Sequence, residues 1–544
     1  MPWLRGPLRR YWAKAARTEL DAMAAKGVWK VVPTPQDGSA RNPIRLTWVL
    51  KIKKNEDSTV DKFRARLCGL GCSQRPGRDY RDKTAPVLHA MSLRSLLAMA
   101  LELGWEIHQL DVSCAFLNAY LEDDIKIYFV PPQGMKIPPG HSLLACKAVY
   151  GLVQAGNRWA ALKSSTLTRL GYKRNGAEPC MWIRNDSRGI VILGIIVDDF
   201  AITGYPVSAI KTAVHEIMAI WDCTYLGQIR WMLNMRITRQ PGVLIIDQSE
   251  YVGEILDQFG LTNAKPVSTP AQLGLHLSKT MAPVTLQEKQ EMQKIPYANA
   301  VGKLLYVRLT RIDTLAAIAE CARFMSNPGK QHWHAIKRIM RYLKGTRHWG
   351  LIYRSSGKTL KDKWTLAVYV DSDHASDPDQ RRSRYGFLIL LNKLCPIAFG
   401  TGMRNKCSAS TPEAEYVALA HALKELLWLI QILESMGITI ARPIPVYEDN
   451  QTCITIANNH MSQKRTRYID IRYHFIRDYT QDGTIKLIYC ETKRMLADIL
   501  TKALPKPQHE RLRNQILTDV LQFLDQDMLT QAAYCKALLT SLTL

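Results

Sequence analysis

Apolar runs that end in acidic residues are the clearest pattern along this chain. Residues 189–197 contain no charged side chain and end at Asp198 and Asp199, after which a second apolar run, 200–204, begins at once. This pattern predicts a β-hairpin with a strand buried on both faces and two carboxylates at the tip. An unpaired buried carboxylate is costly, so the pair needs either cations or solvent. Taken alone, a solvated acidic turn is the simplest interpretation.

A second acid-tipped strand makes a metal site the better hypothesis. Residues 105–110 resemble a strand that ends at Asp111, and Phe116 follows five residues later. Acids from two strands can hold a pair of divalent ions about 3.5 to 4 Å apart, the arrangement that phosphoryl transfer uses. We therefore expect Asp111, Asp198 and Asp199 to form one centre. From its spacing alone the Phe116 ring is expected to pack in the core, with a place under the sugar of an incoming nucleotide as the alternative.

The remaining pattern divides the chain into predicted helices, strands and linkers. We expect helices near 11–28, 91–104, 207–220 and 412–436, a β pair near 225–247, and a helical, basic segment over 297–347. Pro, Ser, Thr and Lys dominate 264–290, which predicts a linker. The pattern resets near 361 into mixed strands and helices, which indicates an α/β or α+β domain. The predicted domains are 1–28, 29–263, 264–360, 361–505 and a tail over 506–544.

A basic hairpin is predicted in the first third of the chain. Residues 48–54 alternate apolar with cationic side chains, turn near 55–58, and return through 62–67. The cations Lys51, Lys53, Arg64 and Arg66 suit phosphate contacts. An ordinary exposed hairpin explains the same pattern equally well.

A second set of acids lies beyond residue 361. Asp371 and Asp449 each end a predicted strand, and Asp498 is expected early in the last major helix. Glu415 lies on the buried side of the helix that begins near 412, so it needs a partner of opposite charge. Its neighbour Glu413 has a simpler explanation, because Ser410 and Glu413 fit a helix capping box.

The composition of the chain indicates what kind of partner it binds. The chain has 73 Lys and Arg residues against 48 Asp and Glu, a net charge of +25, which suits a polyanion such as nucleic acid. The 12 cysteines show no zinc spacing, which indicates reduced thiols. No apolar stretch approaches the roughly 20 residues that span a bilayer, so we expect a soluble protein with no membrane partner.

The motifs, taken in order, resemble the reverse transcriptase and ribonuclease H region of copia-type LTR retrotransposon Pol polyproteins. The resemblance covers about 11–515 and rests on 109–118, 149–155, 197–199, 265–270, 323–328, 341–346, 413–416, 448–451, 469–477 and 496–502. It implies an α+β multidomain fold, a right-hand polymerase followed by a ribonuclease H-like α/β domain. Fingers and a ferredoxin-like palm would occupy 29–263, a linker and helical thumb or connection 264–360, and the ribonuclease H-like domain 361–505.

The resemblance also implies DNA synthesis on RNA or DNA templates and cleavage of the RNA strand of RNA–DNA hybrids. Asp111 and Asp198 would bind metal, Asp199 would support them, and Phe116 would be the sugar gate. Template and triphosphate would contact Lys51, Lys53, Arg64, Arg66, Tyr150, Gly151 and Gln154. Two ions, Mg²⁺ or Mn²⁺, would serve each site, held in the second site by Asp371, Glu415, Asp449 and Asp498. Residues 465–477 would follow the hybrid, with a solvated helix face as the alternative.

The implied partners are an RNA template, a DNA primer, RNA–DNA hybrid and deoxynucleoside triphosphates, with integrase and capsid proteins of the same element. The implied location is a virus-like particle in the cytoplasm, and the nucleus. We find no protease or integrase motif, which predicts the terminal piece of a polyprotein or a decayed copy of one. Four positions depart from the family pattern: Ile196, Gly156, Val153 and Ile312 stand where Tyr, Pro, Lys and Pro are usual. A catalytically inactive nucleic-acid-binding remnant, or a nuclease alone, are the rival hypotheses.

Overall fold

The computed structural model describes residues 7–35, 43–54, 59–132, 135–393, 395–458 and 470–526, with only the backbone described for 53–54 and 470–474. Its contacts divide the chain into two compact units, Met1–Leu88 with His108–Gly227, and His89–Ile107 with Gln228–Leu544. This division differs from the predicted boundary at 263/264. The segment 89–107, expected among the fingers and palm, packs with the second unit instead.

The first unit contains a six-stranded sheet in the order β11-β4-β10-β9-β8-β7. Along the chain its central elements run β4, α3, β9, β10, α4, β11, so the strands stand in the order four, one, three, two of a ferredoxin-like fold. Helices α3 and α4 pack on one apolar cluster with β9 and β10. The elements are β4 (Ile107–Val112), α3 (Ala155–Arg169), β7 (Lys173–Arg174), β8 (Met181–Asp186), β9 (Gly189–Ile196), β10 (Asp199–Tyr205), α4 (Val207–Met218) and β11 (Cys223–Gln228).

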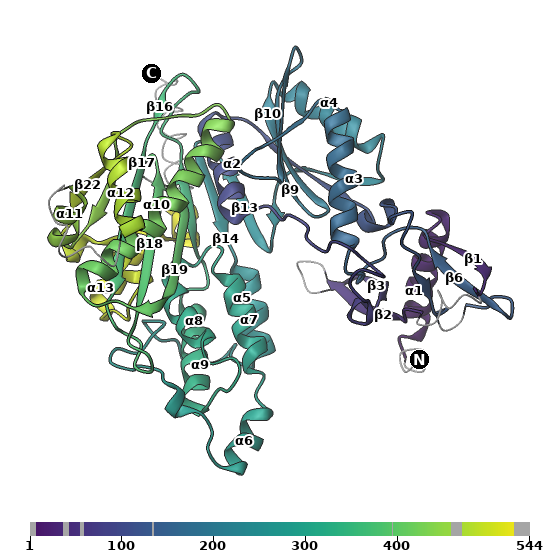
Figure 1. The fold of residues 1–544 in the computed structure, drawn as a ribbon, viewed down its shortest axis with the longest axis horizontal. Coiled ribbons are helices and arrows are strands. Elements are labelled where there is room, and N and C mark those ends of the chain that lie inside the picture. Colours follow the sequence, from purple (N-terminus) through teal and green to yellow (C-terminus); the bar gives the residue numbers. More distant parts are fainter. Residues whose placement is uncertain are drawn as a thin grey trace, which may run out of the picture. The chain divides into compact units, whose positions relative to one another are not determined.

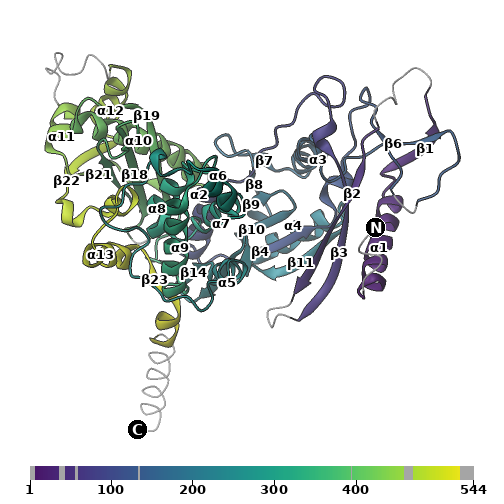
Figure 2. The same ribbon diagram turned by 90° about the horizontal axis from the view of Figure 1, so that it is seen from below.

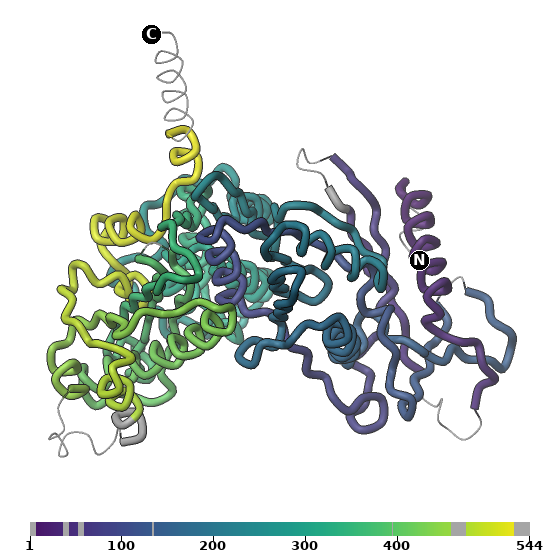
Figure 3. The backbone as a smooth tube through the Cα atoms, turned by 90° about the horizontal axis from the view of Figure 1, so that it is seen from above, coloured from purple at the N-terminus to yellow at the C-terminus, as the bar shows by residue number. Residues whose placement is uncertain are grey.

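The predicted basic hairpin is confirmed and has a helix packed along it. Strands β2 (Leu46–Lys54) and β3 (Val60–Gly69) pair with Lys51 opposite Arg64. Helix α1 (Arg9–Ala25) runs beside β3, as Figures 2 and 3 show, and the Tyr11 ring stacks on Phe63 at 4.9 Å. A small sheet of β1 (Trp29–Pro33), β6 (His141–Ala145) and β5 (Tyr128–Phe129) completes this unit.

The second unit begins with a helical layer around its own apolar core. Helices α5, α7, α8 and α9 pack on one cluster (Figure 1) and adjoin a sheet in the order β12-β13-β14-β15-β23. The expected β pair over 225–247 is therefore divided, since β11 joins the first unit's sheet. The elements are β12 (Trp231–Met232), β13 (Met235–Gln240), β14 (Val243–Asp247), α5 (Ser249–Gln258), α6 (Leu286–Gln293), α7 (Tyr297–Val307), α8 (Leu315–Ala322), α9 (Lys330–Gly345), β15 (Trp349–Arg354) and β23 (Thr518–Asp519).

The predicted linker over 264–290 is wrong as a description of its structure, because the segment is packed against this helical layer. Leu277 is buried in the helical core. Arg341 donates to the Lys265 carbonyl at 2.7 Å, Lys344 to the Ala264 carbonyl at 2.7 Å, and Arg338 to the Thr269 hydroxyl. Cations on α9 thus hold the segment by its backbone, a use of positive charge that composition alone does not reveal.

The last domain has the strand topology of ribonuclease H. Its sheet order is β19-β18-β17-β21-β22, with β17, β18 and β19 antiparallel and β21 and β22 parallel to β17. Asp498 lies in a short 3₁₀ turn, η7 (Leu496–Leu500), rather than in the predicted helix. The elements are β16 (Lys363–Trp364), β17 (Leu366–Asp373), β18 (Arg382–Leu391), β19 (Cys395–Cys407), α10 (Thr411–Ser435), β20 (Thr439–Ile440), β21 (Ile444–Glu448), α11 (Gln451–Asn458), α12 (Asp470–Gln481), β22 (Ile485–Tyr489) and α13 (Lys506–Ile516).

Helix α10 corrects the expectation that no segment is long and apolar enough to cross a bilayer. It is 25 residues long with a mean hydropathy of 1.4 over its most apolar window, but 67% of that window is buried. The helix packs against β17 and β18. Its apolar character is therefore explained by its place in the core of a domain.

A buried arginine explains why α2 (Ala90–Glu102) packs with the second unit. The Arg94 guanidinium donates to the Ile397 carbonyl at 2.8 Å and the Leu309 carbonyl at 3.2 Å, and it lies 4.3 Å from the centre of the Phe399 ring. Burial lowers the pKa of Arg94 to about 10. It makes no ion pair with any carboxylate that the structure describes, so backbone carbonyls and the ring are the contacts that accommodate this charge.

We expect Arg94→Ala to lower the free energy of unfolding by about 2–4 kcal/mol, since it leaves one buried and one part-buried carbonyl unpaired and opens a cavity. Urea unfolding followed by tryptophan fluorescence measures the effect. Arg442→Ala, which removes an exposed arginine paired with Glu434, is the control and should cost no more than about 0.5 kcal/mol. Equal stability of the two variants would contradict the anchoring role of Arg94.

Candidate active sites

The first site is built on the β9–β10 hairpin, which the sequence predicted. Ile196 pairs with Asp199, so Val197 and Asp198 form the turn. Val197 has a φ of 55°, a rare conformation for a β-branched residue and one that stores strain. The Trp159 indole donates to the Val197 carbonyl at 2.7 Å, and the Asp198 carbonyl accepts from the Val112 amide at 2.9 Å. The turn is therefore held from both α3 and β4.

Asp111 and Asp198 line the same cleft, of about 970 Å³, together with Arg64 of β3. Burial raises the pKa of the Asp198 carboxyl, and the neighbouring Asp111 raises it further. Asp199 is not part of the cleft lining; one of its oxygens accepts from the Gln109 amide at 3.4 Å. The geometry thus brings two of the three predicted acids to one cleft, while Asp199 lies outside its lining.

The predicted sugar gate lies in a stack of side chains beside the cleft. The Phe116 ring meets Tyr150 edge to face at 5.3 Å, and the Arg66 guanidinium lies 4.7 Å above the Tyr150 ring. Phe116 is partly buried against the apolar clusters and is not part of the cleft lining. Gly151 has a φ of 84°, and a side chain there would meet the Gly69 carbonyl at 2.3 Å. Only glycine fits this turn.

Three of the predicted substrate-binding residues, Gln154, Lys51 and Lys53, lie in different surroundings. Gln154 is fully buried, accepting from the Gln74 amide at 2.9 Å and donating to the Asp79 carbonyl at 2.8 Å. Gln154 therefore holds the 74–79 loop, and its contact with substrate stays a prediction. Lys51 is exposed on the hairpin face that carries Arg64 and Arg66. The backbone of Lys53 pairs with Lys62, and its side chain lies outside the described residues.

Helix α1 forms a wall of the cleft that the sequence did not predict. Lys14, Thr18 and Glu19 line it, and the Glu19 carboxylate accepts from the Leu67 amide of β3 at 3.3 Å. The sequence showed α1 only as an amphipathic lead-in. Its buried side was visible, but the polar residues at its border carried no sign of a cleft.

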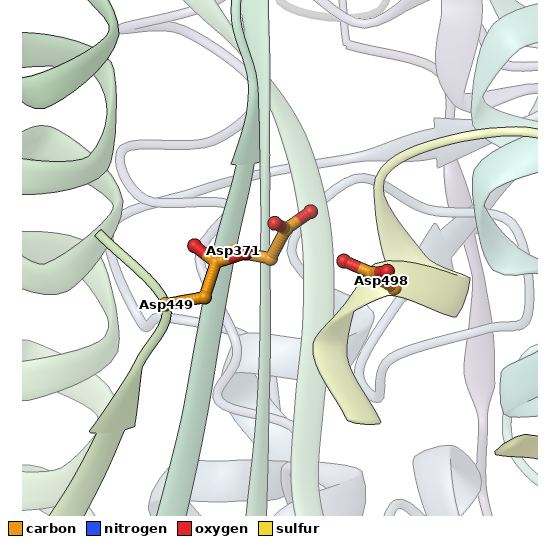
Figure 4. Close-up of side chains that lie close together, drawn as sticks. All are labelled: Asp371, Asp449 and Asp498. Atoms are coloured by element: carbon orange, nitrogen blue, oxygen red, sulfur yellow. The ribbon is translucent and has the colours of Figure 1, made fainter. Parts of the chain in front are cut away.

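The second site gathers acids from four separate elements, β17, α10, the end of β21 and η7. Ligand oxygens of Asp371, Asp449 and Asp498 lie within 4.8 Å of one another, as do those of Glu415, Glu448 and Asp449. Figure 4 shows Asp371 on a central strand, Asp449 just beyond the end of another, and Asp498 on the neighbouring turn. All four predicted acids therefore meet, and Asp449 belongs to both groups. The 465–469 part of the predicted hybrid-binding stretch lies outside the described residues.

Lys502 balances one side of this acidic cluster. Its ammonium lies 2.9 Å from Asp498 and 3.5 Å from Asp371. Burial lowers the pKa of Lys502, but Asp371 and Asp498 raise it by more. The Thr501 hydroxyl donates to Asp371, and the Gln508 amide donates to Asp498 at 3.0 Å. Burial and Asp371 together raise the pKa of Asp498 to about 7.

The other side carries an acid that the sequence reasoning missed. Glu448 is fully buried, and Glu415 is 3% exposed. Burial, followed by repulsion from Glu448 and Asp371, raises the pKa of Glu415 to about 11, and burial raises that of Glu448 well above its usual range. The sequence feature that could have identified Glu448 is an acidic residue at an inward-facing position of the strand that precedes Asp449.

Both sites fit divalent cations by the chemistry of their donors. One buried oxygen of Glu415 and one of Glu448 have no hydrogen-bond partner in the described part of the chain. Orphaned carboxylate oxygens are the hard ligands that Mg²⁺ and Mn²⁺ take. Asp111 and Asp198 in the first cleft offer the same donors, with fewer neighbours.

Comparison with known proteins agrees with this geometry. Residues 26–273 match the family model "Reverse transcriptase (RNA-dependent DNA polymerase)". The chain is 35% identical over 514 residues to the retrovirus-related Pol polyprotein from transposon TNT 1-94 of Nicotiana tabacum, covering 93% of this chain and 38% of that protein. It is 31% identical over 507 residues to the Pol polyprotein from transposon RE1 of Arabidopsis thaliana, covering 93% and 34%. The chain thus spans little more than a third of these relatives.

Among solved structures, the foamy viral protease-reverse transcriptase dRH in complex with double-stranded DNA is similar at 12% identity, with a TM-score of 0.44, over 88% of this chain and 69% of that one. At that score the likeness carries no argument, and the assignment rests on the sequence relatives and on the strand topology. The chain carries a reverse transcriptase domain of the family found in copia-type retrotransposon Pol polyproteins, followed by a domain with the fold of ribonuclease H.

Proposed function

We propose that this chain is an RNA- and DNA-directed DNA polymerase that also cleaves the RNA strand of RNA–DNA hybrids. The observation that carries the proposal is that each unit contains its own set of convergent carboxylates, Asp111 with Asp198, and Asp371 with Glu415, Asp449 and Asp498. Divalent ions bound by these oxygens, Mg²⁺ or Mn²⁺, would activate the attacking oxygen and stabilise the leaving one.

The residues around the first site support polymerisation. Arg64, which lines the same cleft as Asp198, would neutralise the triphosphate, and Phe116 would limit the space beside its sugar. Asp199 would hold the hairpin through Gln109 while Asp198 binds metal. These roles are assigned by position in the structure and by the family resemblance together.

A groove in the second unit supports binding of a polynucleotide. It has a volume of about 320 Å³ and is lined by Asn234, Tyr251, Asn299, Gly302, Lys303 and Tyr306. A side chain at Gly302 would meet nothing within 4 Å, so the helix surface there is open to close approach. The Lys303 ammonium over the Tyr251 ring adds a cation for phosphates.

A crossed pair of substitutions tests both activities. Asp198→Asn should reduce primer extension on an RNA template by at least about 100-fold and spare hybrid cleavage, because it removes a metal ligand of one site only. Asp449→Asn should do the reverse. Asp222→Asn, an exposed aspartate near the first site, is the control and should leave both activities intact.

The crossed experiment also separates the rival functions. Extension by the wild type no greater than by Asp198→Asn would eliminate the polymerase. Hybrid cleavage without extension would indicate a nuclease alone. Salt-sensitive binding to hybrid with neither activity would indicate a remnant, since phosphate contacts survive the loss of chemistry.

Replacing the sugar gate should change the choice of nucleotide. We expect Phe116→Val to lower discrimination against ribonucleotides by about 10- to 100-fold, because a smaller side chain leaves room for a 2′-hydroxyl. Single-nucleotide incorporation with paired deoxy- and ribonucleotides measures this ratio. Phe116→Tyr retains the ring and should retain discrimination. An unchanged ratio in the valine variant, accompanied by lower stability, would indicate that Phe116 serves only in core packing.

Burial of Glu415 predicts a pH-dependent stability in metal-free protein. The pKa of a glutamate in the unfolded chain is about 4.3. In the folded protein, burial raises the pKa of Glu415 to about 11. The folded state therefore retains the proton, and this contribution to stability is full below about pH 4 and decreases as pH rises toward 11. With EDTA, Glu415→Gln should exceed the wild type by only about 1 kcal/mol near pH 5 and by on the order of 2–5 kcal/mol at pH 8.

Thermal melts at the two pH values measure the difference. Added Mg²⁺ should raise the melting temperature of the wild type more at pH 8 than at pH 5, because the ion replaces the missing protons. A Mg²⁺ effect that is equal at both pH values, or absent, would count against a metal site at Glu415.

A further inference from the structure

Glu448 occupies an unusual place for a charged residue. It ends β21, where Ile444, Val446 and Glu448 are the buried positions and alternate with half-exposed neighbours. The alternation would place an apolar side chain at 448. Instead a carboxyl lies there, with an oxygen within 4.8 Å of oxygens of Glu415 and Asp449.

The hydrogen bonds of Glu448 leave it half satisfied. One oxygen accepts from the Asn450 amide at 3.1 Å, and the other has no partner in the described part of the chain. One oxygen of Glu415 is likewise orphaned. Burying polar atoms without partners is costly, and a cation between the two carboxyls, which come within 4.8 Å of one another, would supply the missing contacts.

The ammonium that serves the neighbouring acids does not provide that cation. Lys502 pairs with Asp371 and Asp498, and neither Glu415 nor Glu448 makes an ion pair with any residue that the structure describes. The two groups that share Asp449 thus differ: one includes acids paired with a protein cation, and the other has two orphaned oxygens and no paired cation.

We propose that Glu448 is a further ligand of a divalent metal ion held between Glu415 and Asp449. The inference rests on the proposed ribonuclease H site and adds a fifth carboxylate to it. Three carboxylates around one ion supply hard oxygen donors and charge beyond what a single Mg²⁺ or Mn²⁺ carries. The ion would therefore bind in the absence of nucleic acid, before any substrate phosphate completes its coordination.

Metal binding measured without substrate tests the proposal. Mn²⁺ is titrated into the full-length chain carrying Asp198→Asn, which weakens the first site, and bound ion is counted by electron paramagnetic resonance. In this background Glu448→Gln should raise the dissociation constant of the tightest site at least about tenfold, since it removes one charged ligand and retains the shape. Glu434→Gln, an exposed acid of α10 that pairs with Arg442, is the control and should not change it.

Two further variants, Glu448→Asp and Asp449→Asn, separate the role of Glu448 from that of the metal site as a whole. Glu448→Asp keeps the charge and should bind Mn²⁺ with an affinity between wild type and Glu448→Gln, which covers the case in which the glutamine variant does not fold. Equal affinity for the variants and the wild type, with a stability gain in Glu448→Gln, would overturn the proposal and assign a shared proton to Glu415 and Glu448. If Asp449→Asn also leaves binding unchanged, the proposed metal site itself fails; if only Asp449→Asn weakens binding, Glu448 alone is excluded.

Discussion

Both candidate sites must compensate the repulsion between carboxylates that are held close together and partly buried. Both candidate sites bring acids from different strands to one point, where burial and mutual repulsion raise the pKa values of Asp198, Glu415 and Asp498. Such an arrangement is stable only with bound cations, protons or a protein cation. The second site already contains one compensating charge, because the Lys502 ammonium pairs with both Asp371 and Asp498. In the first site, Lys14, Lys62 and Arg64 line the cleft together with Asp111 and Asp198.

The surrounding fold supplies the energy that holds these acids in place. In the first unit, the strained Val197 turn is fixed by the Trp159 indole, and Trp159 packs edge to face on Trp221 at 5.0 Å within the apolar core. In the second, β17 and β21 lie parallel and adjacent, so Asp371 and Asp449 meet near one edge of the sheet. The burial of apolar side chains elsewhere thus offsets the backbone strain and the charge repulsion at the two sites.

The sequence predicted the features that depend on local pattern, and missed those that depend on distant backbone. Alternation revealed the Lys51–Arg64 hairpin and the acid-tipped strands, since both follow from side-chain period. It did not reveal that Arg341 and Lys344 bind carbonyls of the 264–265 backbone, because a carbonyl leaves no mark in a sequence. Gln154 was expected at the substrate for the same reason: its partners, Gln74 and the Asp79 carbonyl, lie some 75 to 80 residues away.

The residues that depart from the family pattern affect packing and backbone contacts, and none of them replaces an acid of the two sites. Ile196 is buried beside the Val197–Asp198 turn, and the Val153 amide donates to Gln74 at 2.7 Å through its backbone, which any non-proline residue supplies. The buried acids give the stronger argument. Replacing Glu415 or Glu448 with an apolar or amide side chain would relieve an unfavourable burial, so stability alone favours their loss. Their presence together, beside Asp371, Asp449 and Asp498, favours a working metal centre over an inactive remnant.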